Sequence, residues 1–468
     1  MALGKRKPVQ QPLFVTTASL NVRSHPFYEA VNKVLDAHHF DAFVEERCAG
    51  FYDDGGKGGR PGLAPGIYFR CLLVGYFEGI DSERGIDWRC SDSHSLKLFL
   101  GLPIDSPTPD HSTISRTRRL IDLETHAEVF RFLLKVLANH GLVEGKTVGV
   151  DSTTLEANAA MRSIVRRDSG EGYQEFLTKL AKESGIETGQ ASPSRPTRDD
   201  LAKLDRKRKN KASNDDWQSP SDPDAKITKM KDGTTHLAHK AEHAVDLGEG
   251  GHGAILAVNV CDAAAGDTAT LTDTIVASTE NLRAVSDDER VAGKLSDDWM
   301  SETVLDKGYH SKQALLDLEE MNIRSYASEP DRGRQHWARQ HDARDAVYAN
   351  RRRIKGERGK RLLRSRGEKL ERTFAHCYET GGMRRLHLRG RDNIAKRVVL
   401  HAGAFNIGLL MRVKYGLRKP RSRCAAACAL FFELLAWLGS IVARVSVIGR
   451  FGSLRRHFVH QAPARYAA

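Results

Sequence analysis

The chain has 468 residues and a formal net charge of +13, with 73 Lys and Arg against 60 Asp and Glu. This length allows two or three domains with a sizeable core, and the positive balance favours a polyanionic partner where the charge is concentrated. The seven cysteines are scattered and none forms a CxxC pair, which argues against a secreted, disulfide-bonded framework. The basic N-terminus has no apolar segment behind it, so no signal peptide is expected.

The first 141 residues are predicted to be helical after a flexible arm of residues 1–20. Pro65 begins an apolar helical segment, Gly66–Glu78, and Asp81-Ser82-Glu83 is typical of a helix start. We therefore expect an all-α N-terminal domain over residues 21–141.

A basic helix is predicted near the end of this domain, at His111–Leu120, with a capping residue at its head. Its arginines, Arg116, Arg118 and Arg119, lie on one turn. A helix, a tight turn and a basic helix resemble a helix-turn-helix element. A surface helix with solvated arginines is the alternative.

A β-branched run at Thr147–Thr154 is predicted to form a strand that ends on Asp151. An Asp at the C-terminal end of a strand points into the crevice where α/β sheets bind ligands. An ordinary Asp in a strand-to-loop turn is the alternative. The polar residues 156–235 that follow lack apolar periodicity, which predicts a long basic insertion, partly disordered or ordered only on a partner.

Regular elements resume after the insertion in a defined order. Strands are expected at His236–Leu247, Ala254–Cys261, Thr303–Asp306 and Ile323–Ala327, and helices at Asp267–Leu282, Lys312–Met321 and in a long Arg-rich region beyond. Opening strands followed by alternating strands and helices predict a mixed sheet covered on both faces. This is the element order of an RNase H-like domain interrupted after its first strand, and we place that domain at residues 142–412.

Several passages carry a family resemblance when taken together in their order. They are Val148–Thr153 (VGVDST), Val304–Ser311 (VLDKGYHS), Glu371–Phe374 (ERTF), Arg384–Gly390 (RRLHLRG) and Phe405-Asn406. With the N-terminal passages Gly59–Pro65, Gly79–Arg84 and Pro109–Arg116, they resemble bacterial insertion-sequence transposases of the DDE class. The resemblance spans about residues 24–412.

The resemblance implies a catalytic triad of carboxylates that bind metal: Asp151, Asp306 and Glu371. It also implies a divalent-metal cofactor, with two Mg²⁺ or Mn²⁺ ions bound at the site. Mg²⁺ takes carboxylates, water and phosphate oxygens as ligands, and two ions can stabilise both oxygens of an in-line displacement. Enzymes of this class use water to free a 3′-hydroxyl, which then attacks target DNA.

The assignment of the second and third carboxylates has rivals. Asp246, Asp262 and Asp267 also lie at element ends, but the Asp-Lys-Gly-Tyr passage favours Asp306, because Gly308 lets the backbone turn sharply. The third carboxylate has Glu357 and Glu368 as rivals. The related pattern Tyr-x2-Arg-x3-Glu-x6-Lys is split here, because Tyr348 and Arg351 fit its first half while Lys355 stands at the Glu position.

The stretch Arg351–Arg372 holds eleven Lys and Arg against three Glu, a density that suits phosphate contacts. We expect DNA to contact Arg116, Arg118, Arg119, Tyr348, Arg351, Arg366 and Arg372. Trp217, Trp299, Trp337 and Tyr309 are expected in packing rather than in base stacking. His239 and His243 share a strand face without a third ligand nearby, so they are interpreted as ordinary strand residues.

These features predict a DNA transposase that cleaves terminal inverted repeats and transfers strands into double-stranded target DNA. We expect it to act as a homodimer on DNA, in the bacterial cytoplasm at the nucleoid. The alternatives are a structure-specific nuclease without strand transfer and an inactive DNA-binding derivative. Residues 413–468 are predicted to form a basic and apolar helical tail. Its run Cys424–Val445 contains Glu433 and Arg444, which favours a buried or partner-packed helix over a membrane span.

Overall fold

The computed structural model describes residues 4–5, 24–52, 62–183, 201, 213–230, 233–248, 250, 252–333 and 335–420. Most of the predicted arm at residues 1–20, the Gly59–Pro61 part of the N-terminal passage and the apolar run at 424–445 lie outside the described residues. The predicted insertion is described in two parts, 157–183 and 213–230, with Leu201 between them.

The N-terminal part is helical, as predicted. Its helices are α1 (Pro26–Ala37), α2 (Phe40–Cys48), α3 (Pro65–Glu78), α4 (Glu83–Ser91), α5 (His94–Leu100), α6 (His111–Leu120) and α7 (Leu123–Asn139). Helix α3 begins at a proline, whose fixed φ suits the first turn, and ends at Gly79, which adopts a left-handed φ of 65°. Helix α6 begins where Asp110 accepts hydrogen bonds from the amides of Ser112 and Thr113.

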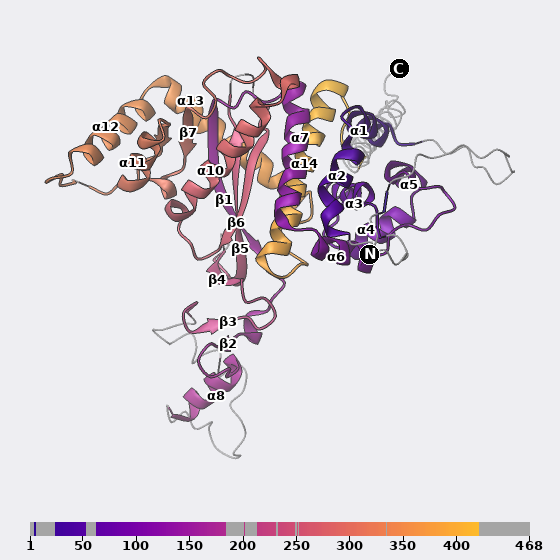
Figure 1. Ribbon diagram of the computed structural model, residues 1–468. Helices are drawn as coiled ribbons and strands as arrows, with labels where there is room; N and C mark the ends of the chain where they lie inside the picture. The colour runs from indigo at the N-terminus through magenta and orange to yellow at the C-terminus, as the bar shows by residue number, and fades with distance from the viewer. Residues whose placement is uncertain are drawn as a thin grey trace, which may run out of the picture. The chain divides into compact units, whose positions relative to one another are not determined.

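The central sheet has the RNase H-like arrangement (Figure 1). Its strands are β1 (Thr147–Glu156), β4 (Lys226–Lys229), β5 (Thr235–Asp246), β6 (Ile255–Asp262), β7 (Glu302–Leu305) and β8 (Arg324–Ala327). The order runs β4-β5-β1-β7-β8, and β6 also pairs with β5. Strand β1 is antiparallel to β5 and parallel to β7, which is parallel to β8. The predicted mixed sheet is therefore confirmed.

The length of β1 corrects one expectation. Asp151 does not end its strand, because β1 continues to Glu156 through its pairing with β5. The pairing with β7 stops earlier, at Val150 opposite Leu305. Asp151 is thus the first β1 residue beyond the end of the parallel ladder, although it lies in the middle of the strand.

Helices cover both faces of the sheet. They are α10 (Asp267–Ser286), α11 (Lys312–Glu320), α12 (His341–Lys355), α13 (Glu357–Phe374) and α14 (Arg391–Tyr415). Helix α10 packs on β5 and β6, whereas α13 packs on β1 and β7. The predicted Arg-rich helical region is divided at Gly356, whose extended ψ of 157° separates α12 from α13.

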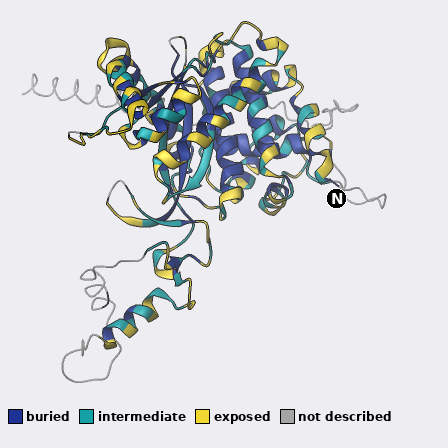
Figure 2. Ribbon diagram, turned by 60° about the vertical axis from the view of Figure 1, so that its left-hand side comes forward, coloured by how far each residue is buried: buried dark blue, intermediate teal, exposed yellow. Residues whose placement is uncertain are grey.

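Helix α14 joins the two parts of the chain. It lies beside α7 and also packs on α3 and β6 (Figure 1). Among the described helices it is the one long and apolar enough to span a membrane, but 89% of its apolar window is buried inside the protein. Buried residues therefore continue from the N-terminal helices into the sheet as one core (Figure 2).

The described part of the insertion has a small core of its own. Strands β2 (Val165–Arg166) and β3 (Trp217–Gln218) pair, and helix α8 (Tyr173–Glu183) follows β2 (Figure 1). Trp217 is buried in this core against Tyr173 and Phe176.

Candidate active site

Two of the predicted carboxylates lie side by side at the end of the β1–β7 ladder. Val150 and Leu305 are the last paired residues of the two parallel strands, and each is followed directly by an aspartate, Asp151 or Asp306. Equivalent positions on neighbouring parallel strands project to the same face of a sheet. This register places the two carboxylates together, although they are far apart in the sequence.

Arg366, on α13, joins the two carboxylates. Its Nη1 donates to Oδ2 of Asp151 at 2.8 Å, and its Nη2 lies 3.6 Å from Oδ1 of Asp306. The backbone amide of Ser152 donates to the other oxygen of Asp151 at 2.8 Å. The aspartate pair therefore already binds a cation, the guanidinium of its own chain.

Burial dominates the electrostatics of Asp151. Desolvation raises the pKa of its carboxyl group above the ordinary value, the positive charge of Arg366 opposes this shift, and Asp306 adds to it. A carboxylate in this setting gains from a nearby positive charge, because its own solvation is incomplete.

The third predicted carboxylate is not beside the pair. Glu371 is exposed on α13, five residues beyond Arg366. Five residues advance a helix by about 500°, so Glu371 projects roughly 140° away from the side of α13 that carries Arg366. Within the described parts of the chain, no group of three or more His, Cys, Asp or Glu could hold a metal ion. Two carboxylates suffice for one Mg²⁺ that keeps its waters, so the pair fits one ion better than two.

The rivals for the third position are exposed and paired elsewhere on the same helix. Glu357 contacts Lys360 at 2.8 Å, and Glu368 forms an ion pair with Arg372. Glu371 remains a prediction for the third carboxylate.

The rivals for the second aspartate have other partners. Asp246 is fully buried and accepts hydrogen bonds from the amides of Glu144, Gly145 and Gly248. Asp262 lies 3.7 Å from Lys226. Asp267 lies on α10, on the opposite face of the sheet from Arg366, where it accepts a hydrogen bond from Ser152.

The arginines predicted to contact DNA differ in their exposure. Arg116 and Arg119 are exposed on α6, whereas Arg118 is buried and donates to Glu83 at 2.8 Å. In this structure the guanidinium of Arg118 links α6 to α4 and is not available to a phosphate. The sequence could not separate these three arginines, because their order on one turn does not reveal which side packs.

The basic residues of α12 and α13 are partly paired. Arg351 binds the carboxylate of Glu329 through two nitrogens, at 2.7 and 2.5 Å, and lies over the ring of Tyr348 at 4.8 Å. Tyr348 is exposed, and Arg372 pairs with Glu368. Tyr348 and Arg351 lie on α12 and Glu371 on α13, so the split pattern in the sequence corresponds to two separate helices.

The aromatic and histidine residues set aside in the sequence are packing residues. Tyr309 is buried, Trp299 packs against the core, and Trp337 lies under the ammonium of Lys312 at 4.6 Å. His239 is buried and bonded to Asp222 at 3.0 Å. His243 is bonded to Tyr378 at 2.6 Å, and burial lowers its pKa to about 3.

Two charged residues of β5 were missed. Lys240 and Glu242 are buried on the α10 face of the sheet, where Glu242 accepts a hydrogen bond from Tyr309. A signal was present, because residues two apart in a strand project to the same face, so Lys240 and Glu242 could have been expected to lie together.

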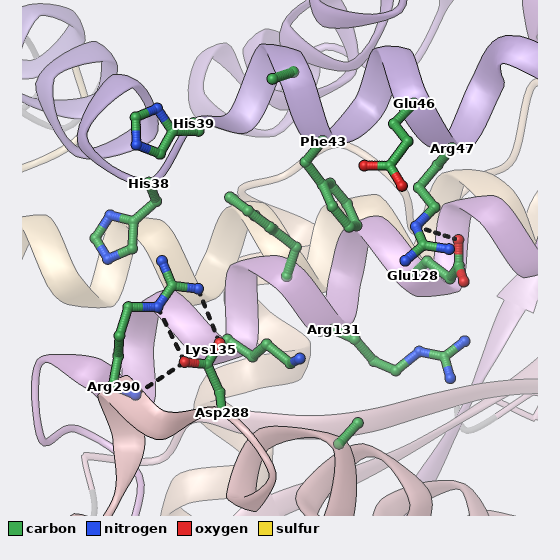
Figure 3. A pocket seen from close by; sticks show the side chains of 13 residues that line it. His38, His39, Phe43, Glu46, Arg47, Glu128, Arg131, Lys135, Asp288 and Arg290 are labelled. Atoms are coloured by element: carbon green, nitrogen blue, oxygen red, sulfur yellow. Dashed lines mark hydrogen bonds and ion pairs between the residues drawn. The ribbon is translucent and has the colours of Figure 1, made fainter.

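A cavity of about 500 Å³ lies elsewhere, between α2, α7 and the segment after α10 (Figure 3). Its charged side chains include Arg47, which contacts Glu128 at 3.7 Å, and Arg290, which contacts Asp288 at 2.9 Å. None of the three predicted catalytic carboxylates lines it. The open end of the β1–β7 ladder, rather than this cavity, is the candidate active site.

Family models match two parts of the chain. Residues 17–120 match a transposase domain (DUF772), and residues 323–411 match a transposase DDE domain. The first range includes α6 with its arginines, and the second includes α12, α13 and Glu371. Both aspartates lie before the second range: Asp151 is in β1, and Asp306 directly follows β7.

Proposed function

We propose that this chain, whose two matched domains are those of an insertion-sequence transposase of the DDE class, cleaves DNA at the terminal inverted repeats of its element and joins the freed ends to target DNA. One observation carries the proposal. An aspartate pair that binds a cation lies at the end of the central parallel ladder of an RNase H-like sheet, in a chain with a DDE domain.

Asp151 and Asp306 would hold a divalent ion, with Glu371 as the proposed third carboxylate. A bound ion of this kind supplies positive charge that stabilises the attacking and leaving oxygens of a phosphodiester. Arg366 would release the pair when the ion binds and would then be free to contact the phosphate. The amide of Ser152 keeps the carboxylate of Asp151 oriented throughout.

Double-stranded DNA is the proposed partner. Arg116 and Arg119 are exposed on α6, and α13, the helix that carries Arg366, also presents exposed basic side chains. Lys and Arg side chains supply the phosphate contacts that hold a duplex in register. Because transposition requires two ends to be held together, we propose a homodimer on DNA, acting in the bacterial cytoplasm at the nucleoid.

A second candidate function is favoured by the position of Glu371. In this conformation the third carboxylate lies away from the aspartate pair, and a guanidinium lies between the two aspartates. A derivative that binds the repeat ends without cutting them would have these features.

A cleavage assay on labelled duplex from the flanks of the gene, in Mg²⁺ or EDTA, separates the two. We expect nicks at the repeat boundary with the wild-type protein and none with Asp151→Asn, Asp306→Asn or Glu371→Gln. Glu320→Gln, which alters an exposed Glu at the end of α11, is the matched control and should cleave normally.

Each failure has a different meaning. Cleavage that survives in Asp151→Asn and Asp306→Asn would refute the proposed chemistry. Tight binding of end duplex without cleavage by any protein would support the inactive derivative. Cleavage of intact end duplex, without strand-transfer products from pre-cut ends, would indicate a nuclease. Cleavage lost in Glu357→Gln or Glu368→Gln, but kept in Glu371→Gln, would reassign the third carboxylate.

A further inference from the structure

A group of buried and half-buried polar side chains lies on the α10 face of the sheet, opposite the face that carries Arg366. We call it the α10-side polar cluster, and it consists of Ser152, Lys240, Glu242, Asp267, Thr270, Thr274 and Tyr309. The catalytic chemistry proposed above uses none of these side chains.

The cluster is attached to the residue that follows Asp151. Successive side chains of a strand project to opposite faces, so Asp151 faces α13 while Ser152 faces α10. The hydroxyl of Ser152 donates to Oδ1 of Asp267 at 3.0 Å, and Nζ of Lys240 donates to the same oxygen at 3.3 Å. Lys240 also donates to the carbonyl of Ala265 at 2.9 Å, which fixes the start of α10.

The cluster is also attached to the residues that follow Asp306. The hydroxyl of Tyr309 donates to Oε1 of Glu242 at 2.6 Å, and both side chains are buried. The intervening Gly308 passes so close to α10 that a Cβ at this position would lie 2.5 Å from Oδ2 of Asp267. The Asp-Lys-Gly-Tyr segment is thus bonded to β5 through Tyr309 and lies against α10 at Gly308.

The carboxylate of Glu242 is buried, which is unfavourable unless its oxygens accept hydrogen bonds. Desolvation raises its pKa, and hydrogen bonds from Thr274, Tyr309 and Thr270 oppose that shift. A buried carboxylate is tolerated where its oxygens have donors, and a satisfied buried network holds its members in one arrangement. Here the donors come from α10 and from the segment after Asp306.

We propose that the α10-side polar cluster sets the separation of the two catalytic aspartates. It holds the residue after Asp151 and the segment after Asp306 to one rigid set of side chains on the far face of the sheet. The inference rests on the proposed function of the pair. Tyr309, Glu242 and Asp267 are positioning residues, because they act through the backbone of the strands and do not touch the reacting atoms.

The test is Tyr309→Phe in the full-length chain, which removes one hydroxyl. Side chains that orient metal ligands typically change metal affinity 10- to 100-fold, so we expect the Mg²⁺ concentration for half-maximal cleavage to rise about tenfold. The rate at saturating Mg²⁺ should change much less. Gly308→Ala disturbs the same segment from the backbone and should shift the Mg²⁺ requirement in the same direction.

Tyr68→Phe is the matched control. Tyr68 is a fully buried tyrosine of α3, and its hydroxyl is bonded to buried His126 at 2.9 Å, in the helical part of the chain. This variant should lose thermal stability as Tyr309→Phe does, but it should keep the wild-type Mg²⁺ requirement. Calorimetric titration of each protein with Mn²⁺, without DNA, measures metal affinity independently of cleavage.

The outcomes separate this inference from the proposed function. Equal Mg²⁺ requirements in Tyr309→Phe and the wild type, or equal shifts in Tyr309→Phe and Tyr68→Phe, would overturn the positioning role. A wild-type protein that binds Mn²⁺ but does not cleave would refute the transposase activity, and weaker Mn²⁺ binding by Tyr309→Phe would still support the cluster. A wild-type protein that neither binds Mn²⁺ nor cleaves DNA would overturn both the positioning role and the transposase activity.

Discussion

Replacing Arg366 by methionine tests the electrostatic balance of the aspartate pair. The substitution keeps an unbranched side chain of good helix propensity, so α13 should persist. It removes the guanidinium that contacts Asp151 at 2.8 Å and Asp306 at 3.6 Å. Two neighbouring carboxylates are then left without their shared positive charge.

The magnitude follows from the exposure of the three side chains. Arg366 is 12% exposed and Asp151 is 26% exposed, so their contact is closer to a buried pair, whereas Asp306 is 45% exposed. Breaking a buried pair costs roughly 3–5 kcal/mol, and an exposed pair contributes at most about 1 kcal/mol. We expect Arg366→Met to lower the free energy of unfolding by about 2 kcal/mol at neutral pH.

A divalent ion should restore the positive charge that the guanidinium of Arg366 provides beside the two aspartates. Because a ligand that binds the native state stabilises it, Mg²⁺ should raise the thermal midpoint of Arg366→Met more than that of the wild type, in which Arg366 competes for the same oxygens. Thermal unfolding in Mg²⁺ and in EDTA measures both effects. Arg364→Met, which alters an exposed arginine of the same helix, is the control.

Two results would contradict this reasoning. If Arg366→Met is as stable as Arg364→Met in EDTA, the guanidinium does not stabilise the pair. If Mg²⁺ stabilises the wild type and Arg366→Met equally, the ion and the guanidinium do not share a site.

Two further predictions concern the helical part of the chain. Arg118→Ala should lower the free energy of unfolding by roughly 3 kcal/mol, because it leaves the largely buried carboxylate of Glu83 without its partner. Arg119→Ala should keep the wild-type stability and reduce the salt dependence of duplex binding by about one ion. Denaturation and mobility-shift titrations measure the two effects, and the opposite assignment of the effects to the two variants would contradict the prediction. Burial lowers the pKa of His126 from 6.5 to about 4, so its neutral form favours the native state above pH 6.5 and this contribution is lost as the pH falls through 4. This loss of unfolding free energy amounts to about 3 kcal/mol, and it should be absent from His126→Gln. Equal slopes of unfolding free energy against pH for the wild type and His126→Gln would contradict the prediction.

Local signals determined many of the elements. Proline at the first turn and a capping aspartate fix the starts of α3 and α6, and these features depend on residues within one helical turn. The strand before Asp306 and the helix containing Asn406 likewise follow from short apolar runs. Asp151, Asp306 and Glu371 could be named as candidates because short motifs around them resemble those of the transposase family.

The candidate site itself depends on contacts between distant segments. The pairing of Val150 with Leu305 sets Asp151 beside Asp306, and the packing of α13 on these strands sets Arg366 between them. The break at Gly356 and the rotation of α13 carry Glu371 to the exposed side of its helix.

The sequence by itself determined the helical N-terminal part, the order of strands and helices, and the residue types that the chemistry needs. The tertiary structure alone decided which carboxylates meet, which arginine is buried with Glu83, and that Lys240 and Glu242 lie beneath the site. The physical reason is the separation along the chain of the residues that interact. Caps and strand propensities act between near neighbours in the chain, whereas strand register and helix rotation are set by the burial of apolar faces from segments more than a hundred residues apart.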